Sequence, residues 1–309
     1  MKRKYLTLGI SAFVIVISLL IFSCKKHNNQ TSNTTTNNTS TDSETSGASD
    51  NIYAENVSND ITNIGDQAGG TSSGKTLSTY KVDGDNSFFL LSCVDSIRRD
   101  SVSSPKVITV YFNGNNVCQD GRTRSGQLKF SYTGGLHYRD SGVVITVTPV
   151  AYTVDGNQIS GTKTITNKGR INGNFQWQIV SSLTIVKANN GGTITWNCNK
   201  TKELLNTGAV YTAPNWPINW KAAKIGITGN ASGTTASGET YTATVTSQLV
   251  KDFTCAPSLV YPHRHPFIQG SFDFTPGTKA TRHVDYGNGS CDLNATVTIN
   301  GISYPITLP

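Results

Sequence analysis

The strongest constraint on the fold is an alternation of apolar and polar residues that recurs through residues 81–309. It is clearest in residues 128–132, 175–179, 194–196, 241–245 and 293–299. Successive side chains of a β-strand point to opposite faces of the sheet, so each stretch directs one row toward a core and Thr, Ser or Gln toward water. Antiparallel sheets with one solvated face have this pattern.

Turn residues separate the alternating stretches. The clearest are Asn300 and Gly301, which predict a type I′ hairpin because both residues tolerate a positive φ. A single short helix is expected, over residues 201–206. The sequence therefore predicts an all-β fold that is antiparallel and rich in meanders, built as a sandwich or as a strongly curved open sheet.

The chain begins with a segment typical of export. Residues 2–4 are basic, residues 6–22 are predominantly apolar, and Ser23 and Cys24 precede a polar stretch. These are the parts of a secretory signal peptide. A cysteine at this place resembles a bacterial lipobox, which implies diacylglycerol on Cys24 and removal of residues 1–23. The alternative is an uncleaved signal-anchor helix, for which about 17 apolar residues are at the short limit.

Residues 24–80 are expected to form a lipidated N-terminus and a disordered tether. Residues 27–79 consist mostly of Asn, Ser, Thr and Gly, with almost no aromatic residues. Such a segment buries too little apolar surface to offset the entropy lost on ordering. The alternative is a helical or coiled segment over residues 52–64. We therefore expect the globular all-β domain to span residues 81–309.

Charge is divided unevenly between these parts. Residues 27–79 contain six acidic residues and one lysine, whereas residues 81–309 contain 20 basic and 13 acidic residues. A basic domain outside the cell favours anionic polysaccharide or lipopolysaccharide as a partner, and its location argues against nucleic acid. Scattered solubilising lysines explain the same excess.

Three motifs carry a resemblance to a known family. They are CQDGRTRSG at residues 118–126, DYGNGSCD at residues 285–292 and ATVTING at residues 295–301. Together with the lipobox, they resemble a family of uncharacterised surface lipoproteins of the Bacteroidetes, over roughly residues 90–309. The resemblance implies a lipid-anchored protein of the outer membrane, and it brings no established activity.

Five cysteines remain apart from Cys24, and an exported protein favours disulfides between them. Their spacing cannot assign the pairs. We expect Cys255 to pair with Cys291 and Cys93 with Cys118, which leaves Cys198 free and buried beside a tryptophan. No C-x-x-C motif occurs, which argues against a redox or zinc-ribbon site.

The aromatic residues suggest one candidate binding site. Trp216 and Trp220 lie in a proline-rich loop, where they could form a platform for sugar rings with Asn215 and Asn219 as hydrogen-bonding partners. The alternative is that both rings plug the end of a sheet. Trp177 and Trp196 lie in alternating strands and are expected in the core.

Catalytic and metal-binding motifs are sparse. His263, His265 and His283 would be the minimum for a catalytic zinc, but there is no HExxH motif and no nearby glutamate, so we expect neither a metal nor another cofactor. Residues 81–309 contain two glutamates, and no nucleophile elbow occurs. A hydrolase would need clustered carboxylates in a cleft. The candidates for such a cluster are Asp120, Asp252, Asp273 and Asp285.

The sequence therefore favours a noncatalytic surface binding or adhesion module, with glycans as the first ligand to consider. It is expected in the cell envelope, held to a membrane by the lipid on Cys24, with surface polysaccharide or envelope proteins as partners. The alternative is a structural or envelope-assembly protein that a partner recognises through a sheet edge.

Overall fold

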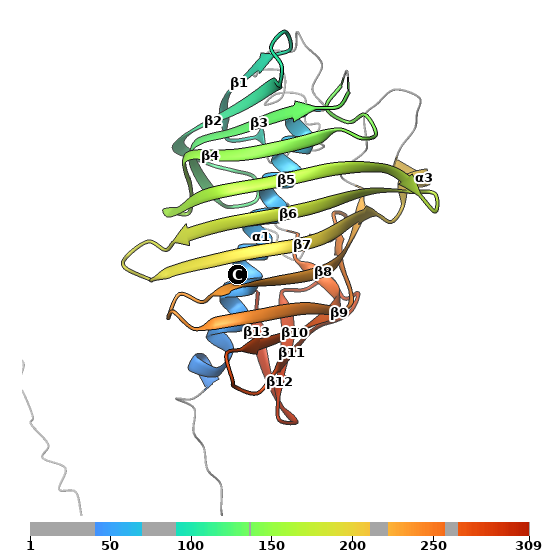
Figure 1. Ribbon diagram of the computed structural model, residues 1–309. Coiled ribbons are helices and arrows are strands. Elements are labelled where there is room, and N and C mark those ends of the chain that lie inside the picture. The colour runs from blue at the N-terminus through green and yellow to red at the C-terminus, as the bar shows by residue number, and fades with distance from the viewer. Residues whose placement is uncertain (1–40, 70–90, 136, 211–221, 257–264, 309) are drawn as a thin grey trace, which may run out of the picture. The chain divides into compact units, whose positions relative to one another are not determined.

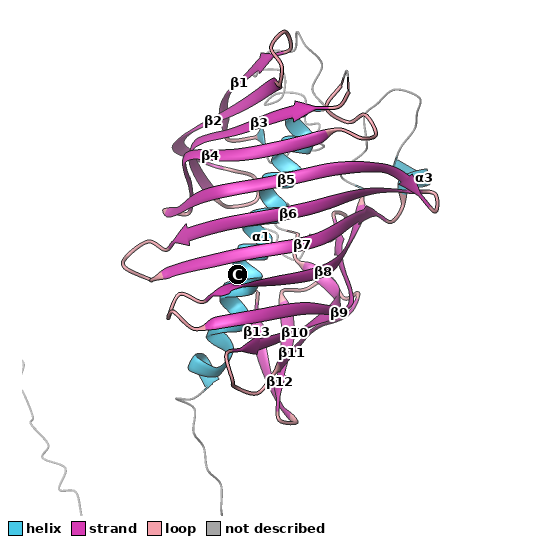
Figure 2. Ribbon diagram, viewed as in Figure 1, coloured by secondary structure: helices cyan, strands magenta, loops and turns pink. Residues whose placement is uncertain are grey.

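The computed structural model describes residues 41–69, 91–135, 137–210, 222–256 and 265–308. In this part of the chain, 13 antiparallel strands form one sheet in which each strand pairs with its sequence neighbours (Figures 1 and 2). The strands are β1 (Val94–Asp100), β2 (Lys106–Val117), β3 (Thr123–Thr133), β4 (Val144–Val154), β5 (Asn157–Ile171), β6 (Asn174–Val186), β7 (Thr193–Leu204), β8 (Lys224–Thr234), β9 (Thr240–Asp252), β10 (Phe267–Pro276), β11 (Arg282–Asn288), β12 (Asn294–Ile299) and β13 (Ile302–Thr307).

The sheet is an open meander, because β1 and β13 each pair with one neighbour and not with each other. Of the two predicted architectures, the strongly curved open sheet is therefore confirmed. The hairpin at Asn300 and Gly301 is confirmed as well, since their φ angles of 50° and 81° are those of a type I′ turn. The local turn chemistry thus sets the register between β12 and β13.

A long helix, α1 (Thr41–Gly69), lies on one face of this sheet and contacts β2, β7, β11 and β13. Figure 1 shows it running across the strands. Ile52, Ile61 and Ile64 are fully buried, and so are most polar side chains of the helix. Because the helix is buried on all sides by strands far apart in the sheet, the sheet must curve around it.

The core lies between α1 and the inward rows of the strands. It takes one side chain in two from each central strand, as the alternation predicts, and the burial pattern of β7 repeats with period two. Trp177 and Trp196 are buried in this core, as expected. The outward rows of the same strands face solvent.

The prediction of a disordered tether is wrong for Thr41–Gly69, which forms α1. The helical alternative over residues 52–64 is confirmed and extends well beyond that range in both directions. The segment is rich in Asn, Ser, Thr and Gly, which form helices poorly on their own. Its helix therefore depends on tertiary contacts, which supply most helical stability in proteins. The expected domain boundary at residue 81 is wrong for the same reason, since α1 belongs to the core.

The prediction of a short helix over residues 201–206 is also wrong. β7 continues to Leu204, and the helix that follows, α3, spans Thr207–Val210. Lys202 and Leu204 keep the inward period of the strand and are buried. Pairing of β7 with both of its neighbours along this stretch overrides the local helical preference.

Glycines allow the sheet to bend around the helix. Gly229 in β8 has a φ of 114°, and a Cβ placed there would lie 2.3 Å from the carbonyl oxygen of Asn199 on β7. The pairing of β8 with β9 shifts register beside it, between Ile227 and Asn230. Such bulges increase the local twist and curvature of a sheet.

We predict that a chain beginning at residue 81 does not fold cooperatively. Burial of Ile52, Val57, Ile61 and Ile64 contributes about 6–12 kcal/mol at about 1.5–3 kcal/mol each. That sum is comparable to the whole net stability of a domain, about 5–15 kcal/mol. Circular dichroism during chemical denaturation should show no sigmoidal transition.

A chain beginning at Asn38, which keeps α1, is the control and should unfold cooperatively like the full chain. A sharp transition in the chain that begins at residue 81 would show that the sheet does not need the helix.

Candidate functional site

The interior of the sheet is an electrostatic match between an acidic helix and basic strands. Each of the four acidic side chains of α1 whose surroundings are described faces a base, which lies on a strand in three cases and directly after β6 in the fourth. The ion pairs join Asp50 to Lys187 (3.0 Å), Glu55 to Lys200, Asp60 to Arg124 (3.4 Å) and Asp66 to Lys202 (3.0 Å). Acidic residues of the first part of the sequence therefore pair with basic residues of the second part inside the molecule.

Hydrogen bonds to neutral groups of the helix extend this match along its length. The Trp196 indole donates to Asn51 Oδ1 at 3.1 Å, and the Asn157 amide donates to the Tyr53 hydroxyl at 2.7 Å. Near the end of the helix, Arg99 on β1 donates to the Ala68 carbonyl at 2.6 Å. Strands β1, β5 and β7 thus bind the helix through specific polar contacts.

Lys163 is the most deeply buried of the interior lysines. Its ammonium donates to the Ser58 carbonyl at 2.9 Å and to the Ser58 hydroxyl. Burial lowers the pKa of Lys163 to about 8, and the nearby Cys198 and Glu55 only partly offset that effect. A serine and a lysine with a lowered pKa can form a nucleophile and its base, but both groups here are enclosed by the helix and the strands. The pair therefore serves the packing of α1.

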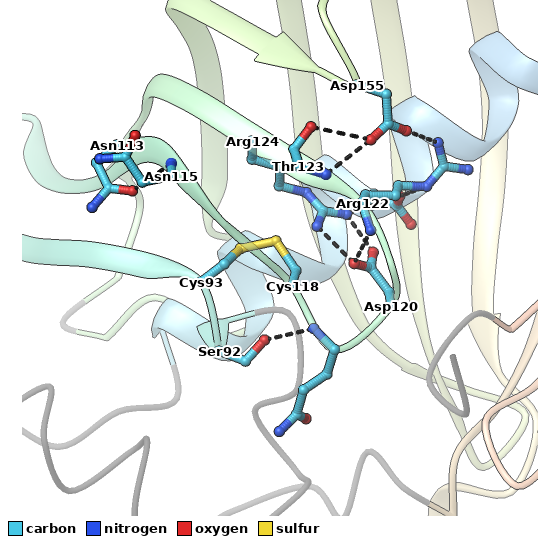
Figure 3. The surroundings of a disulfide bond; sticks show 12 residues. Ser92, Cys93, Asn113, Asn115, Cys118, Asp120, Arg122, Thr123, Arg124 and Asp155 are labelled. Carbon is cyan, nitrogen blue, oxygen red and sulfur yellow. Dashed lines mark hydrogen bonds and ion pairs between the residues drawn. A yellow bond between two sulfur atoms is a disulfide. The ribbon is translucent and has the colours of Figure 1, made fainter. Parts of the chain in front are cut away.

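A second polar cluster lies beside a disulfide at one end of the sheet (Figure 3). Arg124 donates to both carboxylate oxygens of Asp120, and Arg122 pairs with Asp155 at 3.2 Å. Burial alone would raise the pKa of Asp120, but the Arg124 and Arg122 guanidinium groups outweigh it and hold this pKa below its usual range. The carboxylate of Asp120 is thus fully engaged in structural contacts.

The other carboxylates considered for hydrolysis have separate partners. Asp252 accepts hydrogen bonds from Thr254, Asp273 lies 2.7 Å from His283 Nδ1, and Asp285 accepts from the Gly287 amide at 2.8 Å. Within the described ranges, no group of three or more His, Cys, Asp or Glu side chains has the arrangement of a metal site. These residues therefore form no common catalytic centre.

Two disulfides join the pairs that the sequence analysis expects, Cys93 to Cys118 and Cys255 to Cys291. Cys198 is free and buried on β7, two residues from Trp196. His265 Nδ1 donates to the Cys255 carbonyl oxygen at 2.6 Å, and the histidine is buried. This histidine therefore belongs to the packing around a disulfide.

Several predicted residues lie outside the described part of the chain. These are Cys24 at the lipidation site and the four residues of the proposed sugar platform, Asn215, Trp216, Asn219 and Trp220. Lipidation and the platform therefore stay predictions. His263 lies in the undescribed residues as well.

The structure brings together a different set of residues on the outer face of the sheet. A shallow groove of about 400 Å³ crosses the middle of β5, β6, β7 and β8. We call it the outer groove. Its outward side chains are Thr162, Thr164, Val180, Ser182, Asn197, Asn199, Asn230 and Ser232.

The outer groove consists of two adjacent rows that run across the strands. One row pairs Thr164 with Val180, Val180 with Asn199 and Asn199 with Asn230, and the other pairs Thr162, Ser182, Asn197 and Ser232 in the same way. In Figure 1, the strands that carry these rows lie side by side, with α1 behind them. The groove and the helix thus occupy opposite faces of the sheet.

Most polar side chains of the outer groove make no side-chain hydrogen bond to the described residues, unlike those of nearby outward positions. Beside it, Thr195 bonds to Thr234 at 2.8 Å, and further along the sheet Thr246 bonds to Ser271 at 2.8 Å. Within the groove, the Gln178 amide on β6 donates to Asn199 Oδ1 on β7 and orients it. No side-chain hydrogen bond within the described residues involves any of the remaining groove hydroxyls and amides, which are Thr162, Thr164, Ser182, Asn197, Asn230 and Ser232.

The sequence alone predicts that Thr, Ser and Asn of these strands face water, but it does not predict the groove. The groove exists because four strands pair in a register that aligns small polar side chains in adjacent rows. If any of these strands were shifted by two residues against its partner, each side chain would stay on the same face but would have different neighbours across the sheet. Locating the groove therefore requires the pairing register of these four strands.

Comparison with protein-family models, curated proteins and solved structures finds no match to this chain. Neither helix in the described ranges is long and apolar enough to cross a membrane. The resemblance to surface lipoproteins of the Bacteroidetes accordingly stays a prediction from the sequence motifs.

We predict that the pair formed by Glu55 and Lys200 couples α1 to the sheet. Removal of one partner, as in Glu55→Leu or Lys200→Met, leaves a buried charge and should lower the free energy of unfolding by about 3–5 kcal/mol. The double variant should lose clearly less than the sum of the two. Chemical denaturation of all four proteins gives the coupling energy.

The control for this cycle is the exposed pair Lys279 and Glu239, which lie 2.7 Å apart. Glu239→Gln should change stability by less than about 1 kcal/mol because solvent screens the pair. Additive losses in the Glu55 and Lys200 cycle would contradict the coupling.

We predict that Asp120 contributes to stability at neutral pH and that the contribution disappears in acid. Its pKa is lower in the folded than in the unfolded chain, where it is about 3.9. A depressed carboxyl pKa stabilises the fold above the unfolded pKa, and the benefit is lost as the pH falls through the folded pKa.

The difference in stability between the native chain and Asp120→Asn should therefore shrink as the pH is lowered below about 4. Denaturation curves at a series of pH values provide the measurement. A difference that stays constant down to the acid end of the series would show that Asp120 acts without its charge.

Proposed function

We propose that the protein is a noncatalytic binding module of the cell envelope that takes its ligand on the outer face of its sheet. The observation that supports this most directly is the location of α1. The helix fills the concave side, where curved sheets commonly hold ligands, and its polar groups are engaged by the strands. The outer groove then offers an open set of polar side chains on the opposite face of the sheet.

A noncatalytic role agrees with the chemistry of the described residues. The carboxylates considered for hydrolysis are each engaged by their own neighbours, and the groove lining holds hydroxyls and the Cys198 thiol but no carboxylate, lysine or histidine that could activate them. General acid–base and nucleophilic mechanisms require such groups at the site of reaction. The outer groove is therefore suited to binding alone.

The lipobox-like start of the chain and the motifs that resemble those of surface lipoproteins support a membrane-anchored location. In this proposal a lipid on Cys24 holds the protein to a membrane of the envelope, the outer membrane by the family resemblance, and the folded part extends into the surrounding space. Residues 25–40 separate the anchor from α1 and would span at most roughly 58 Å. The sugar platform at Trp216 and Trp220 is a second possible contact for the same class of ligand.

The alternative, recognition through a sheet edge, has less support. The edge strand β1 carries Arg98, Arg99 and Asp100, and the edge strand β13 contains Pro305. Charged residues and proline on an edge are devices that prevent another strand from adding to it. A structural role in envelope assembly would then have to use another surface.

We predict that the outer groove carries the binding of this protein to envelope material. The full chain, immobilised in lipid vesicles, is incubated with polysaccharide and protein fractions from the cell envelope. Ser182→Arg places a long charged side chain in the middle of the groove and should reduce the retained material at least tenfold.

The matched control is Thr296→Arg, which places the same side chain at an exposed, outward position of β12 away from the groove. This variant should retain as much as the native chain. Equal retention by all three proteins, or retention by none, would contradict the proposed function.

A further inference from the structure

We infer that the outer groove binds an extended, uncharged polysaccharide that lies across β5 to β8. The inference rests on the proposed function and adds the site and the class of ligand to it. It follows from three properties of the groove, which are its lack of charge, its open hydrogen-bonding groups and the regular spacing of its two rows.

The first property is the absence of charge. Every outward position of the central strands near the groove is uncharged, and these residues are Thr, Ser, Asn, Gln and Val. They are Ser160, Thr162, Thr164, Thr166, Gln178, Val180, Ser182, Thr184, Thr195, Asn197, Asn199, Thr201, Thr228, Asn230, Ser232 and Thr234. Such a surface offers no ionic contact to phosphate, carboxylate or sulfate groups.

The positive charge of the sheet lies elsewhere. Six basic side chains of the strands are buried, and so is Arg122 directly before β3; several of these bases pair with α1. They are Arg122, Arg124, Lys163, Lys200, Lys202, Lys251 and Arg282. The basic composition therefore does not support binding of lipopolysaccharide or another anionic polysaccharide at this face. We therefore replace the anionic ligand expected from composition alone with a neutral one.

The second property is the open hydrogen-bonding capacity. A hydroxyl donates one hydrogen bond and accepts two, and a carboxamide donates two and accepts two. Asn197 and Asn230 lie in adjacent rows on neighbouring strands, with Ser182 and Ser232 in the row of Asn197. Sugar hydroxyls also both donate and accept, so they match a mixed surface of this kind. Val180, which is 49% exposed, adds an apolar contact for the carbon side of a sugar ring.

The third property is the repeat. Neighbouring strands lie about 4.8 Å apart, so each row presents one group at that interval over about 14 Å. This interval is close to the advance of one ring along an extended glycan chain. A polymer that lies along the rows can therefore repeat the same contact from strand to strand.

The same properties predict how affinity depends on the length of the ligand. Each hydrogen bond exchanged with water contributes only about 0.5–1.5 kcal/mol. The described lining of the groove contains no aromatic ring on which a sugar could stack. Short oligosaccharides should therefore bind weakly, and affinity should rise with each added ring until the groove is filled.

The test is affinity electrophoresis of the full chain in detergent, through gels that contain dextran, mannan, a mixed-linkage β-glucan, alginate or heparin. At least one of the three neutral polymers should retard the native protein, and higher ionic strength should not weaken that effect. Alginate and heparin should cause no retardation that survives higher ionic strength. Retardation by the anionic polymers alone would overturn the inference.

Variants locate the site. Ser182→Arg should abolish retardation by the neutral polymer, and Asn197→Ala should weaken binding about tenfold, as loss of about 1.4 kcal/mol implies. Thr296→Arg and Thr296→Ala are the matched controls and should bind like the native chain. Neutral binding that survives Ser182→Arg would overturn the inference.

The outcomes also separate this inference from the proposed function. If no neutral polymer binds while Ser182→Arg still abolishes retention of envelope material, the neutral-polysaccharide inference fails and the proposed function stands. If Ser182→Arg abolishes a concentration-dependent self-association measured by ultracentrifugation and no neutral polymer binds, the occupant is a second copy and the inference is overturned. If retention of envelope material is insensitive to Ser182→Arg, the proposed function fails.

Discussion

The contact between an acidic helix and the basic interior of the sheet is the interaction on which the rest of the structure depends. Neither part is stable alone by ordinary criteria. α1 contains too many Asn, Ser, Thr and Gly residues to persist as a free helix, and an open sheet of 13 strands needs something to curve around. Burial of Lys200 and Lys202 is costly, and the carboxylates of Glu55 and Asp66 offset much of that cost. Ion pairing and apolar burial therefore fold the helix and curve the sheet together.

This arrangement decides which surface is left for function. Most curved sheets leave their concave side to a ligand, but here the chain supplies its own occupant for that side. The convex side keeps the outward rows of the strands, and over β5 to β8 these rows carry small uncharged polar groups in register. Beneath the groove, the bases Lys163, Lys200 and Lys202 point the other way, toward α1. The ion pairs inside the sheet thus leave an uncharged groove on its outer face.

The sequence was informative wherever a residue's role depends on its near neighbours. Period-two alternation is enough to predict antiparallel strands with one wet face, and the φ preferences of Asn300 and Gly301 predict their hairpin. The disulfides of Cys93 with Cys118 and Cys255 with Cys291 also match the expectation, although spacing alone left them open. Composition failed at α1, because it measures the propensity of an isolated segment, and this helix exists only in contact with the strands.

By itself, then, the sequence determined the class of fold, the direction in which each strand faces and the separation of acidic from basic segments. Tertiary structure decided that these charges meet, since only the curved sheet brings Lys163, Lys187, Lys200 and Lys202 to one helix. It also decided the outer groove, because strand register aligns Ser182 with Asn197 and Asn197 with Ser232. Alternation excludes a shift of one residue between paired strands, because that shift would reverse the faces, but it does not distinguish registers that differ by two residues. A side chain's face is therefore a local property, whereas its neighbours across the sheet depend on the pairing of the whole chain.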